Sequence, residues 1–192
     1  LNAVDKLDGD SLIRIIQRFH ELGVCQVHLS GGEPLNRFND ILRILDSFPS
    51  GIDFWVFSNG YNLDDQKASV LRKHGLTGVV ISLDHYDPAN HDAFRGVPGS
   101  FQRAINAAKA ARSHGLLVAF SCCATNQFIS TGNLSRYISV CKNAGASFVQ
   151  LLEPEAVGHF AGQSVQLTSE SRHKMVELFC DVNFDPSFKT YP

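Results

Sequence analysis

The chain has 192 residues, of which 44% are hydrophobic and 19% are charged, and its formal net charge is −2. This length and composition predict one globular domain, and the charge balance argues against a nucleic-acid or anionic-membrane partner. No apolar run reaches the roughly 20 residues of a membrane span. Five cysteines without regular spacing do not predict a disulfide framework, so we expect a cytoplasmic protein.

Six segments have the apolar periodicity of amphipathic helices, and five short apolar runs between them are typical of buried parallel strands. Strands and helices that alternate at this spacing predict consecutive βα units. The chain therefore has the predicted order α(βα)5, followed by a short tail. The predicted helices are residues 11–22, 38–48, 64–74, 100–114, 134–144 and 169–180, and the predicted strands are 24–29, 52–57, 78–83, 116–121 and 148–152.

Polar and flexible residues follow each predicted strand, whereas the turns that lead from helix to strand are short and mostly contain glycine. In parallel α/β proteins, ligands bind at the carboxyl ends of the strands. We therefore expect the functional site at that edge of the sheet. The polar segments are residues 30–34, 58–60, 82–87, 121–126 and 153–155.

Five short motifs occur in a fixed order: Gly-Gly-Glu-Pro at 31–34, Ser-Asn-Gly at 58–60, Ile-Ser-Leu-Asp at 81–84, His-Asp-Ala-Phe-Arg-Gly at 91–96 and Gly-Ser-Phe at 99–101. Together they resemble the radical S-adenosylmethionine (radical SAM) enzymes, especially the branch with the molybdenum-cofactor cyclase and the peptide- and sulfatase-maturing enzymes. The resemblance implies an α/β fold, an incomplete TIM-like (β/α)6 barrel of parallel strands whose first strand is missing. It also implies one partial core domain over residues 1–192, truncated at both ends.

The family binds a 4Fe–4S cluster through a CxxxCxxC motif, and this sequence does not contain that spacing. Adjacent Cys122 and Cys123 would face opposite sides of a strand. We predict that all five cysteines are small buried apolar residues and that the cluster ligands lie in a segment upstream of residue 1. By this interpretation the chain is a fragment that alone does not hold a cluster.

The resemblance assigns Glu33 to the methionine amino group of SAM, beside glycines that let the backbone approach the ligand. Ser58 and Asn59 would hydrogen-bond SAM or shape their turn. Ser82 and Asp84 would face the ribose or the carboxylate, or cap neighbouring helices. The implied SAM-binding set is Gly31, Gly32, Glu33, Pro34, Ser58, Asn59, Ser82, Asp84, Arg95 and Asn126.

Two members of this set, and three other residues, carry open alternatives. Arg95 would bind the ligand carboxylate or pair with Asp92, and Asn126 would contact the ribose. Two glutamates after the last predicted strand, Glu153 and Glu155, would reach the substrate or the adenosine end. His28 lies within a predicted strand, and we expect it to be a packed core histidine.

The implied function is that of a radical SAM enzyme, in which SAM is cleaved to a 5′-deoxyadenosyl radical that abstracts a substrate hydrogen. The implied partners are a substrate, for which a peptide is one candidate, and an electron donor of the flavodoxin or ferredoxin type. One alternative is a non-catalytic SAM-binding or scaffold domain without a cluster. Another is a metal-dependent barrel hydrolase that uses Asp84, His85, Asp87, His91 and Asp92.

Overall fold

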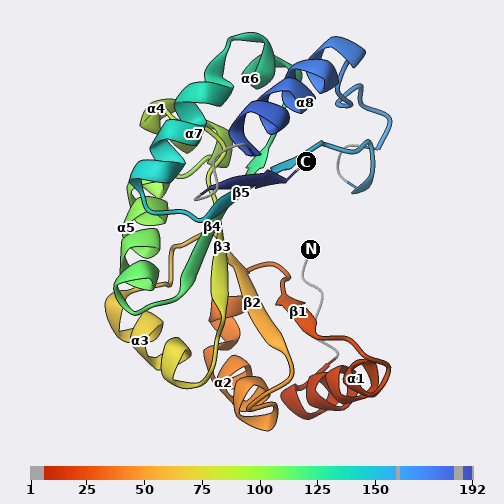
Figure 1. The fold of residues 1–192 in the computed structure, drawn as a ribbon, viewed down its shortest axis with the longest axis vertical. Coiled ribbons are helices and arrows are strands. Elements are labelled where there is room, and N and C mark those ends of the chain that lie inside the picture. Colours follow the sequence, from red (N-terminus) through yellow and green to blue (C-terminus); the bar gives the residue numbers. More distant parts are fainter. Residues whose placement is uncertain (1–6, 159–160, 184–187, 192) are drawn as a thin grey trace.

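The computed structural model describes residues 7–158, 161–183 and 188–191 and shows one curved sheet of six parallel strands (Figure 1). The strands lie side by side in chain order, so β1 and β6 form the two edges of the sheet. The predicted α/β fold with a partial barrel is confirmed. The strands are β1 (Gln26–Leu29), β2 (Asp53–Ser58), β3 (Gly78–Ser82), β4 (Leu117–Cys123), β5 (Phe148–Leu152) and β6 (Lys189–Tyr191).

All six predicted helices are present, and the described residues also contain three short helical elements that periodicity did not predict. One of them, α4, starts after Asp87, whose side chain accepts a hydrogen bond from the Asn90 amide, and has Pro88 in its first turn. The helices are α1 (Gly9–Glu21), η1 (Pro34–Arg37), α2 (Phe38–Ser47), α3 (Asp65–Lys73), α4 (Pro88–Arg95), α5 (Ser100–Ser113), α6 (Asn126–Ser130), α7 (Asn133–Asn143) and α8 (Ser169–Asn183).

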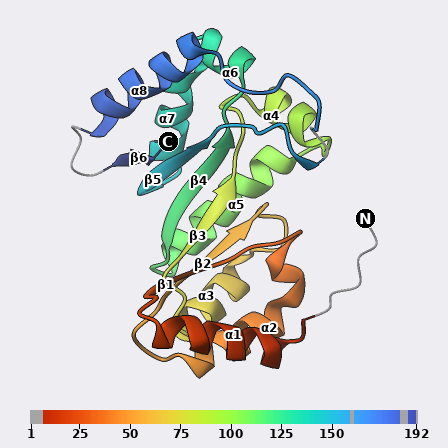
Figure 2. The same ribbon diagram turned by 90° about the vertical axis from the view of Figure 1, so that its right-hand side faces the viewer.

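The helices between the strands cover the convex face of the sheet, and the concave face opens on the opposite side, toward the viewer in Figure 2. The main core lies between helices and sheet. Helix α5 contributes a row of four alanines, all at most 1% exposed, which allows the helix to approach β3 and β4 closely. The alanines are Ala104, Ala107, Ala108 and Ala111.

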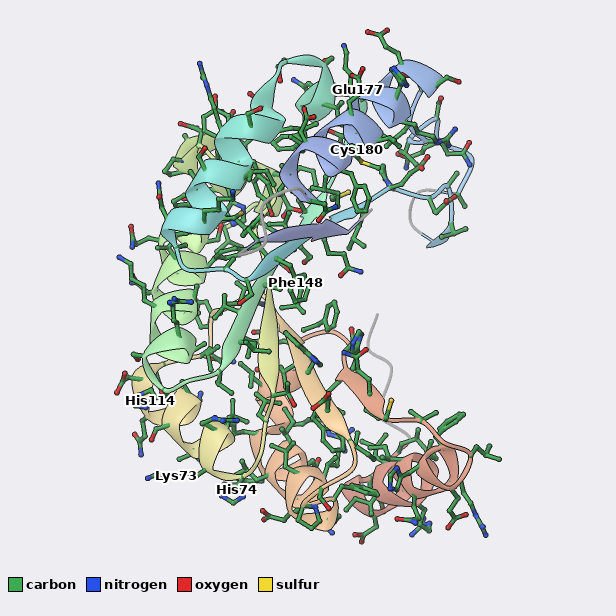
Figure 3. All side chains as sticks on the ribbon, in the orientation of Figure 1. Lys73, His74, His114, Phe148, Glu177 and Cys180 are labelled. Atoms are coloured by element: carbon green, nitrogen blue, oxygen red, sulfur yellow. The ribbon has the colours of Figure 1, made fainter. Side chains whose placement is uncertain are left out.

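A second, aromatic cluster fills part of the concave face. The ring of Trp55 lies over Gly78, where an added Cβ would come within 2.5 Å of the indole. Its centroid is 5.5 Å from that of Phe148, which Figure 3 labels on the concave side. Val80 and Ala119 complete this buried cluster. The lack of a side chain at position 78 therefore lets one large ring close this part of the sheet.

A polar row follows the aromatic cluster toward the carboxyl ends of the strands. Ser82 pairs in register with Ser121, and Ser121 pairs with Gln150. Each lies two residues beyond a member or neighbour of the aromatic cluster, and alternate strand residues point to the same face. The concave face therefore changes from apolar to polar as it approaches the predicted site.

Two expectations were wrong, that His28 is packed in the core and that all five cysteines are buried, and one strand was not predicted. The tail predicted after the last helix contains β6, which pairs with β5. His28 is exposed and touches the ring of Phe57, with centroids 5.0 Å apart, because β1 is an edge strand and its concave side is open. Cys25 and Cys180 are exposed rather than buried, the latter on α8 (Figure 3). The opposite facing of Cys122 and Cys123 is confirmed, since one is buried in the main core and the other is half-buried beside a cavity.

Among the described helices, none is long and apolar enough to cross a bilayer.

Candidate functional site

Glu33 is tied to the carboxyl end of β2. Its Oε1 accepts a hydrogen bond from the Ser58 hydroxyl at 2.9 Å, and its Oε2 accepts one from the Asn59 amide at 2.9 Å. The Leu35 amide also donates to Oε1, at 3.2 Å. A carboxylate has about four acceptor positions, so Glu33 retains one for a ligand donor. The structure thus brings three residues of the predicted set, Glu33, Ser58 and Asn59, into direct contact.

The backbone around Glu33 explains the motif at 31–34. Gly31 has a φ of 151°, a conformation that side-chain-bearing residues rarely adopt, and no atoms lie within 4 Å of a Cβ built at Gly31 or Gly32. Pro34 then starts the helical turn η1, with Glu33 as its N-cap. The two glycines therefore leave open space beside a carboxylate that the following turn fixes in place.

Asp84 connects three elements at the ends of β3 and β4. Its Oδ1 accepts a hydrogen bond from the Cys123 amide at 2.8 Å, and its Oδ2 forms an ion pair with Arg95 Nε. The Asp84 amide donates to His91 Nδ1 at 3.0 Å. The Asp84 side chain is 2% exposed and that of Arg95 is 34% exposed. Pairing with Asp92 was one of the two alternatives for Arg95, and the structure pairs Arg95 with Asp84 instead.

Asp92 instead fixes the start of α5. It accepts hydrogen bonds from the Gly99 amide, the Ser100 hydroxyl and the Phe101 amide, and these bonds hold the pKa of Asp92 below its usual value. Because these three donors occupy the Asp92 carboxylate, it is less available for an ion pair, and Arg95 pairs with Asp84 instead.

His91 serves as a neutral hydrogen-bond acceptor. Its ring is buried, packs against Phe101 with centroids 5.9 Å apart, and accepts the Asp84 amide on Nδ1. Burial lowers the pKa of His91, which keeps Nδ1 free of a proton. The histidine therefore positions the loop that carries Asp84.

A cavity of about 220 Å³, here named the Arg95 cavity, lies beside the Glu33 cluster, the name used here for Glu33, Ser58 and Asn59. Asn59, Ser82 and Arg95 of the predicted set all line it, and they come from the ends of β2, β3 and α4. The ion pair with Asp84 is made by Nε of Arg95, and the guanidinium carries four further N–H donors at its two terminal nitrogens. A carboxylate and a guanidinium thus lie on neighbouring segments of one open rim.

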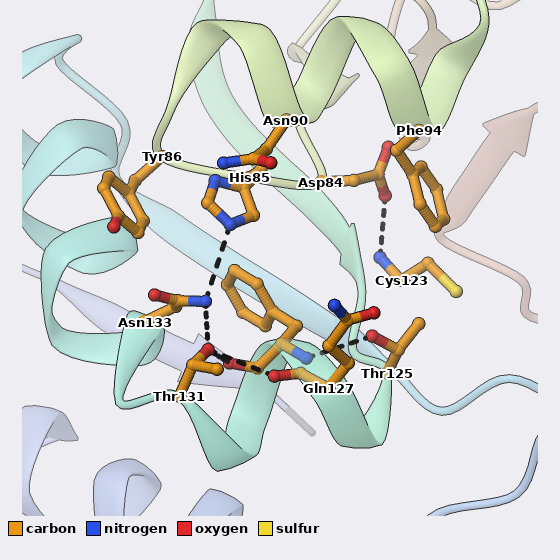
Figure 4. Close-up of a pocket in the computed structure, with 11 residues that line it drawn as sticks. Asp84, His85, Tyr86, Asn90, Phe94, Cys123, Thr125, Gln127, Thr131 and Asn133 are labelled. Atoms are coloured by element: carbon orange, nitrogen blue, oxygen red, sulfur yellow. Dashed lines mark hydrogen bonds between the residues drawn. The ribbon is translucent and has the colours of Figure 1, made fainter.

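A second cavity of about 340 Å³ lies between α4 and α6 (Figure 4). Asp84 and Cys123 line one side of it, and burial raises the pKa of the Cys123 thiol, which keeps it protonated. His85 lines it as well, with Nδ1 accepting the Asp87 amide at 2.9 Å, and burial lowers the pKa of this imidazole. The lining is therefore uncharged apart from Asp84, whose charge is paired with Arg95.

The polar residues after β4 and β5 are engaged with the segment before α8. Asn126 donates to the Gln166 carbonyl and accepts from the Thr168 amide, both at 2.9 Å. Glu153 accepts from the Leu167 amide at 3.1 Å and forms an ion pair with Arg172. Neither residue is brought into contact with the Glu33 cluster, although both follow strands as the sequence rule requires.

The metal-hydrolase alternative lacks a ligand set in the described part of the chain. No group of three or more histidine, cysteine, aspartate or glutamate side chains is placed there to hold a metal ion. Asp84 pairs with Arg95, Asp87 caps α4 and Asp92 caps α5. The five cysteines are likewise dispersed, so the described residues do not fit a 4Fe–4S cluster.

Some residues at the site are outside the SAM-binding set that the resemblance implies. Ser121 and Gln150 extend the polar row of the concave face, and strand alternation could have indicated them. Tyr61 and Arg103 line the Arg95 cavity from a turn and from α5. No local pattern marks either of them, because their proximity depends on how α5 packs against the end of β2.

A parallel partial barrel with polar groups at its carboxyl rim defines the class, an α/β protein with a small-ligand site at the strand ends. The model of the radical SAM superfamily matches residues 2–128, which is more than half of the chain. The chain therefore belongs to the radical SAM superfamily. This family uses SAM and a 4Fe–4S cluster, and its members are enzymes.

Two relatives and one solved structure illustrate the similarity. The AdoMet-dependent heme synthase of Nitratidesulfovibrio vulgaris is 26% identical over 170 residues, covering 87% of this chain and 45% of the relative. The sporulation killing factor maturation protein SkfB of Bacillus subtilis is 28% identical over 156 residues, covering 80% of this chain and 37% of SkfB. Streptococcus suis SuiB has a TM-score of 0.77 at 18% identity, covering 97% of this chain and 44% of SuiB. The chain thus spans less than half the length of these proteins.

Proposed function

We propose that this chain is the SAM-binding core of a radical SAM enzyme and that SAM binds along the rim formed by the ends of β1, β2 and β3. The observation that carries the proposal is the tethered Glu33 carboxylate beside the Arg95 cavity. An amino-acid group carries an ammonium and a carboxylate on one carbon. A rim with one acidic and one basic group at neighbouring positions matches both charges.

Each part of the rim has a distinct task in this proposal. Glu33 accepts the ammonium of the methionine portion, because its hydrogen bonds from Ser58 and Asn59 leave one acceptor position open. Gly31 and Gly32 leave room for the ligand at this carboxylate. Ser82 and Arg95 face the same cavity and offer donors to the carboxylate or ribose. Asp84 holds Arg95 in orientation through their ion pair.

In the radical SAM family, a 4Fe–4S cluster would, when bound, supply the electron for cleavage of SAM. The five cysteines of the described residues are not placed to bind such a cluster, so we assign none of them to it. The role proposed for this chain is to bind and orient SAM. An electron donor of the flavodoxin or ferredoxin type and a cytoplasmic location remain predictions.

A peptide is the substrate class that we propose. Support comes from SkfB, named for the maturation of a killing factor, and from a solved structure of SuiB bound to its precursor peptide SuiA. SuiB has also been solved with bound S-adenosylmethionine. The concave face, with its aromatic cluster and polar row, offers the mixed surface that a peptide requires.

Calorimetric titration of SAM into the chain tests the proposed ligand. Substitution Glu33→Gln removes the charge but keeps a side chain of the same size, and we expect the dissociation constant to rise by about tenfold or more. The matched control is Glu153→Gln, which also follows a strand and should leave the affinity unchanged. Absence of SAM binding by the unsubstituted chain, or equal binding by the Glu33 variant, would contradict the proposal.

Retention of a random decapeptide library by the immobilised chain tests the proposed substrate class. We expect enrichment of particular peptides in the presence of SAM and less enrichment after Phe57→Asp, which places a charge on the concave face. Retention that does not depend on SAM or on Phe57 would contradict a peptide site on this surface.

A further inference from the structure

The Arg95 cavity contains a second guanidinium that the resemblance to the family does not assign. Arg103, at the end of the first turn of α5, lines this cavity together with Asn59, Ser82 and Arg95. Its guanidinium carbon lies 4.6 Å from the centroid of the Tyr61 ring, a cation–π contact. The cavity therefore presents two cations from two different helices.

Arg103 is positioned by the turn that also holds Glu33. The Asn59 amide donates to Glu33 Oε2 at 2.9 Å, and the Asn59 side-chain oxygen accepts the Tyr61 amide at 2.8 Å. Gly60, between them, has a φ of 78°, and an added Cβ would lie 3.1 Å from Ala104 Cα. The turn thus packs directly on α5, one residue away from Arg103, and places the Tyr61 ring against its guanidinium.

The two arginines differ in how their charge is compensated. Arg95 is paired with the buried carboxylate of Asp84. Arg103 contacts the Tyr61 ring, and none of the ion pairs among the described residues includes Arg103. Asp92, the residue of α4 that caps the start of α5, is engaged by three donors and does not line the cavity. Among the described residues, the cation of this cavity that lacks a carboxylate partner is therefore Arg103.

We propose that Arg103 is a specificity-determining residue that binds the carboxylate of the ligand whose ammonium Glu33 accepts. Arg95 then acts as the secondary donor, with its Nε committed to Asp84. This inference rests on the proposed function and changes the residue that carries the main electrostatic contact. A carboxylate contact with Arg103 would make the chain prefer ligands with an intact amino-acid group. A ligand without a carboxylate leaves Arg103 without an anion to bind.

A pair of ligands that differ only in the carboxylate tests the role of Arg103. SAM and decarboxylated SAM are titrated calorimetrically into the unsubstituted chain and into Arg103→Gln. We expect Arg103→Gln to raise the dissociation constant of SAM about tenfold, which is the effect of losing one charge-assisted contact. The dissociation constant of decarboxylated SAM should not change. Lys109→Gln is the matched control, because it removes the same charge from an exposed position of the same helix and should alter neither affinity.

The Tyr61 ring provides a second, independent test of positioning. Tyr61→Leu removes the cation–π contact and should lower the affinity for SAM about threefold. Tyr61→Phe keeps the ring and should preserve that affinity. A structural role alone would not separate these two variants or discriminate between the two ligands. Both positions are exposed, so the fold is expected to survive each substitution.

Three results would overturn the inference. Equal SAM affinity in Arg103→Gln and the unsubstituted chain excludes a contact with the carboxylate. An equal loss of affinity for SAM and for decarboxylated SAM in Arg103→Gln shows a general charge effect instead of carboxylate recognition. Failure of the unsubstituted chain to bind SAM overturns the proposed function and the inference together, which distinguishes it from the first two outcomes.

Discussion

The carboxyl rim of the sheet consists of two halves that look alike in sequence and differ in structure. At the ends of β1, β2 and β3, polar side chains contact one another, as Glu33 does with Ser58 and as Asp84 does with Arg95. Arg95 also lines a cavity at this edge, together with Asn59 and Ser82. At the ends of β4 and β5, Asn126 and Glu153 spend their hydrogen-bonding groups on the segment before α8. Both halves thus have polar residues at strand ends, so position at a strand end does not by itself distinguish a binding residue from a structural one.

The difference teaches that a site residue is defined by which of its donors and acceptors remain unused. Glu33 keeps an acceptor position, and Arg95, which pairs with Asp84 through Nε, also lines the open cavity. Asn126 uses both its amide oxygen and its amide nitrogen on backbone groups. The first half of the rim is thus suited to bind a ligand, and the second half stabilises the fold around it.

The largest effect should come from Asp84, which joins β3, β4 and α4 in the first half of the rim. We expect Asp84→Ala to lower the free energy of unfolding by about 3 kcal/mol, because it leaves the Cys123 amide and the Arg95 cation without their partner. Urea unfolding followed by circular dichroism measures this loss. Glu155→Ala, at an exposed position in the second half, is the control. A loss below about 1 kcal/mol would show that Asp84 does not organise this half.

His91 should have the next largest effect, because it accepts the Asp84 amide in a buried position. We expect His91→Leu to cost about 1–2 kcal/mol of unfolding free energy, since the Asp84 amide is then left without an acceptor. His91→Asn retains an acceptor oxygen and should recover part of the loss. The same unfolding measurement distinguishes the two variants, and equal losses would mean that packing of the ring, rather than its hydrogen bond, is what matters.

Acidification should destabilise the first half of the rim more than the second. Burial lowers the pKa of His91 below its usual value of 6.5 in the folded state. As pH falls through that value, the unfolded chain takes up a proton that the folded chain resists, so unfolding becomes easier. Unfolding free energies at pH 7 and pH 5 should differ more in the unsubstituted chain than in His91→Asn.

Burial also lowers the pKa of His85, so this residue should add to the loss of stability at low pH. Comparing the pH dependence of unfolding in His85→Asn and in His91→Asn measures the contribution of each histidine. An identical pH dependence in the unsubstituted chain and both variants would contradict the assignment of this sensitivity to the first half of the rim.

The smallest effect should come from Glu153 in the second half. Its side chain is about a quarter exposed, and we expect Glu153→Gln to cost about 0.5 kcal/mol, the usual value for an exposed pair. Faster hydrogen exchange of the Leu167 amide should accompany it, since that amide donates to Glu153. A reduction of SAM affinity in this variant would break the comparison, because it would give the second half a role in binding.

The fold was predictable to the extent that it depends on local pattern. The five predicted strands and six predicted helices are all present, because buried parallel strands and amphipathic helices each leave a periodic trace in the sequence. The short helix α4 was missed, since eight residues give too little periodicity. Cys180 and His28 were misplaced because burial depends on which neighbours cover an element, and pattern alone does not say which faces stay open.

The candidate site was predictable as a location, but its partnerships were not. The order of the motifs placed Glu33, Ser58 and Asn59 at adjacent strand ends, and the structure joins them. The partner of Arg95 differed from the one considered, because the distance from Arg95 to Asp84 is set by how α4 folds back over β3. Binding of SAM by these residues stays a prediction until it is measured.

The sequence by itself determined the class of fold, the family and the edge of the sheet where polar chemistry gathers, because these follow from periodicity and from motifs within single loops. The tertiary structure decided which polar groups are free. It assigned Asn126 and Glu153 to the segment before α8, paired Arg95 with Asp84, and brought Arg103 to the cavity through the turn at Gly60. Hydrogen bonds and ion pairs form between residues far apart in the chain, so only the packed molecule determines which of them remain for a ligand.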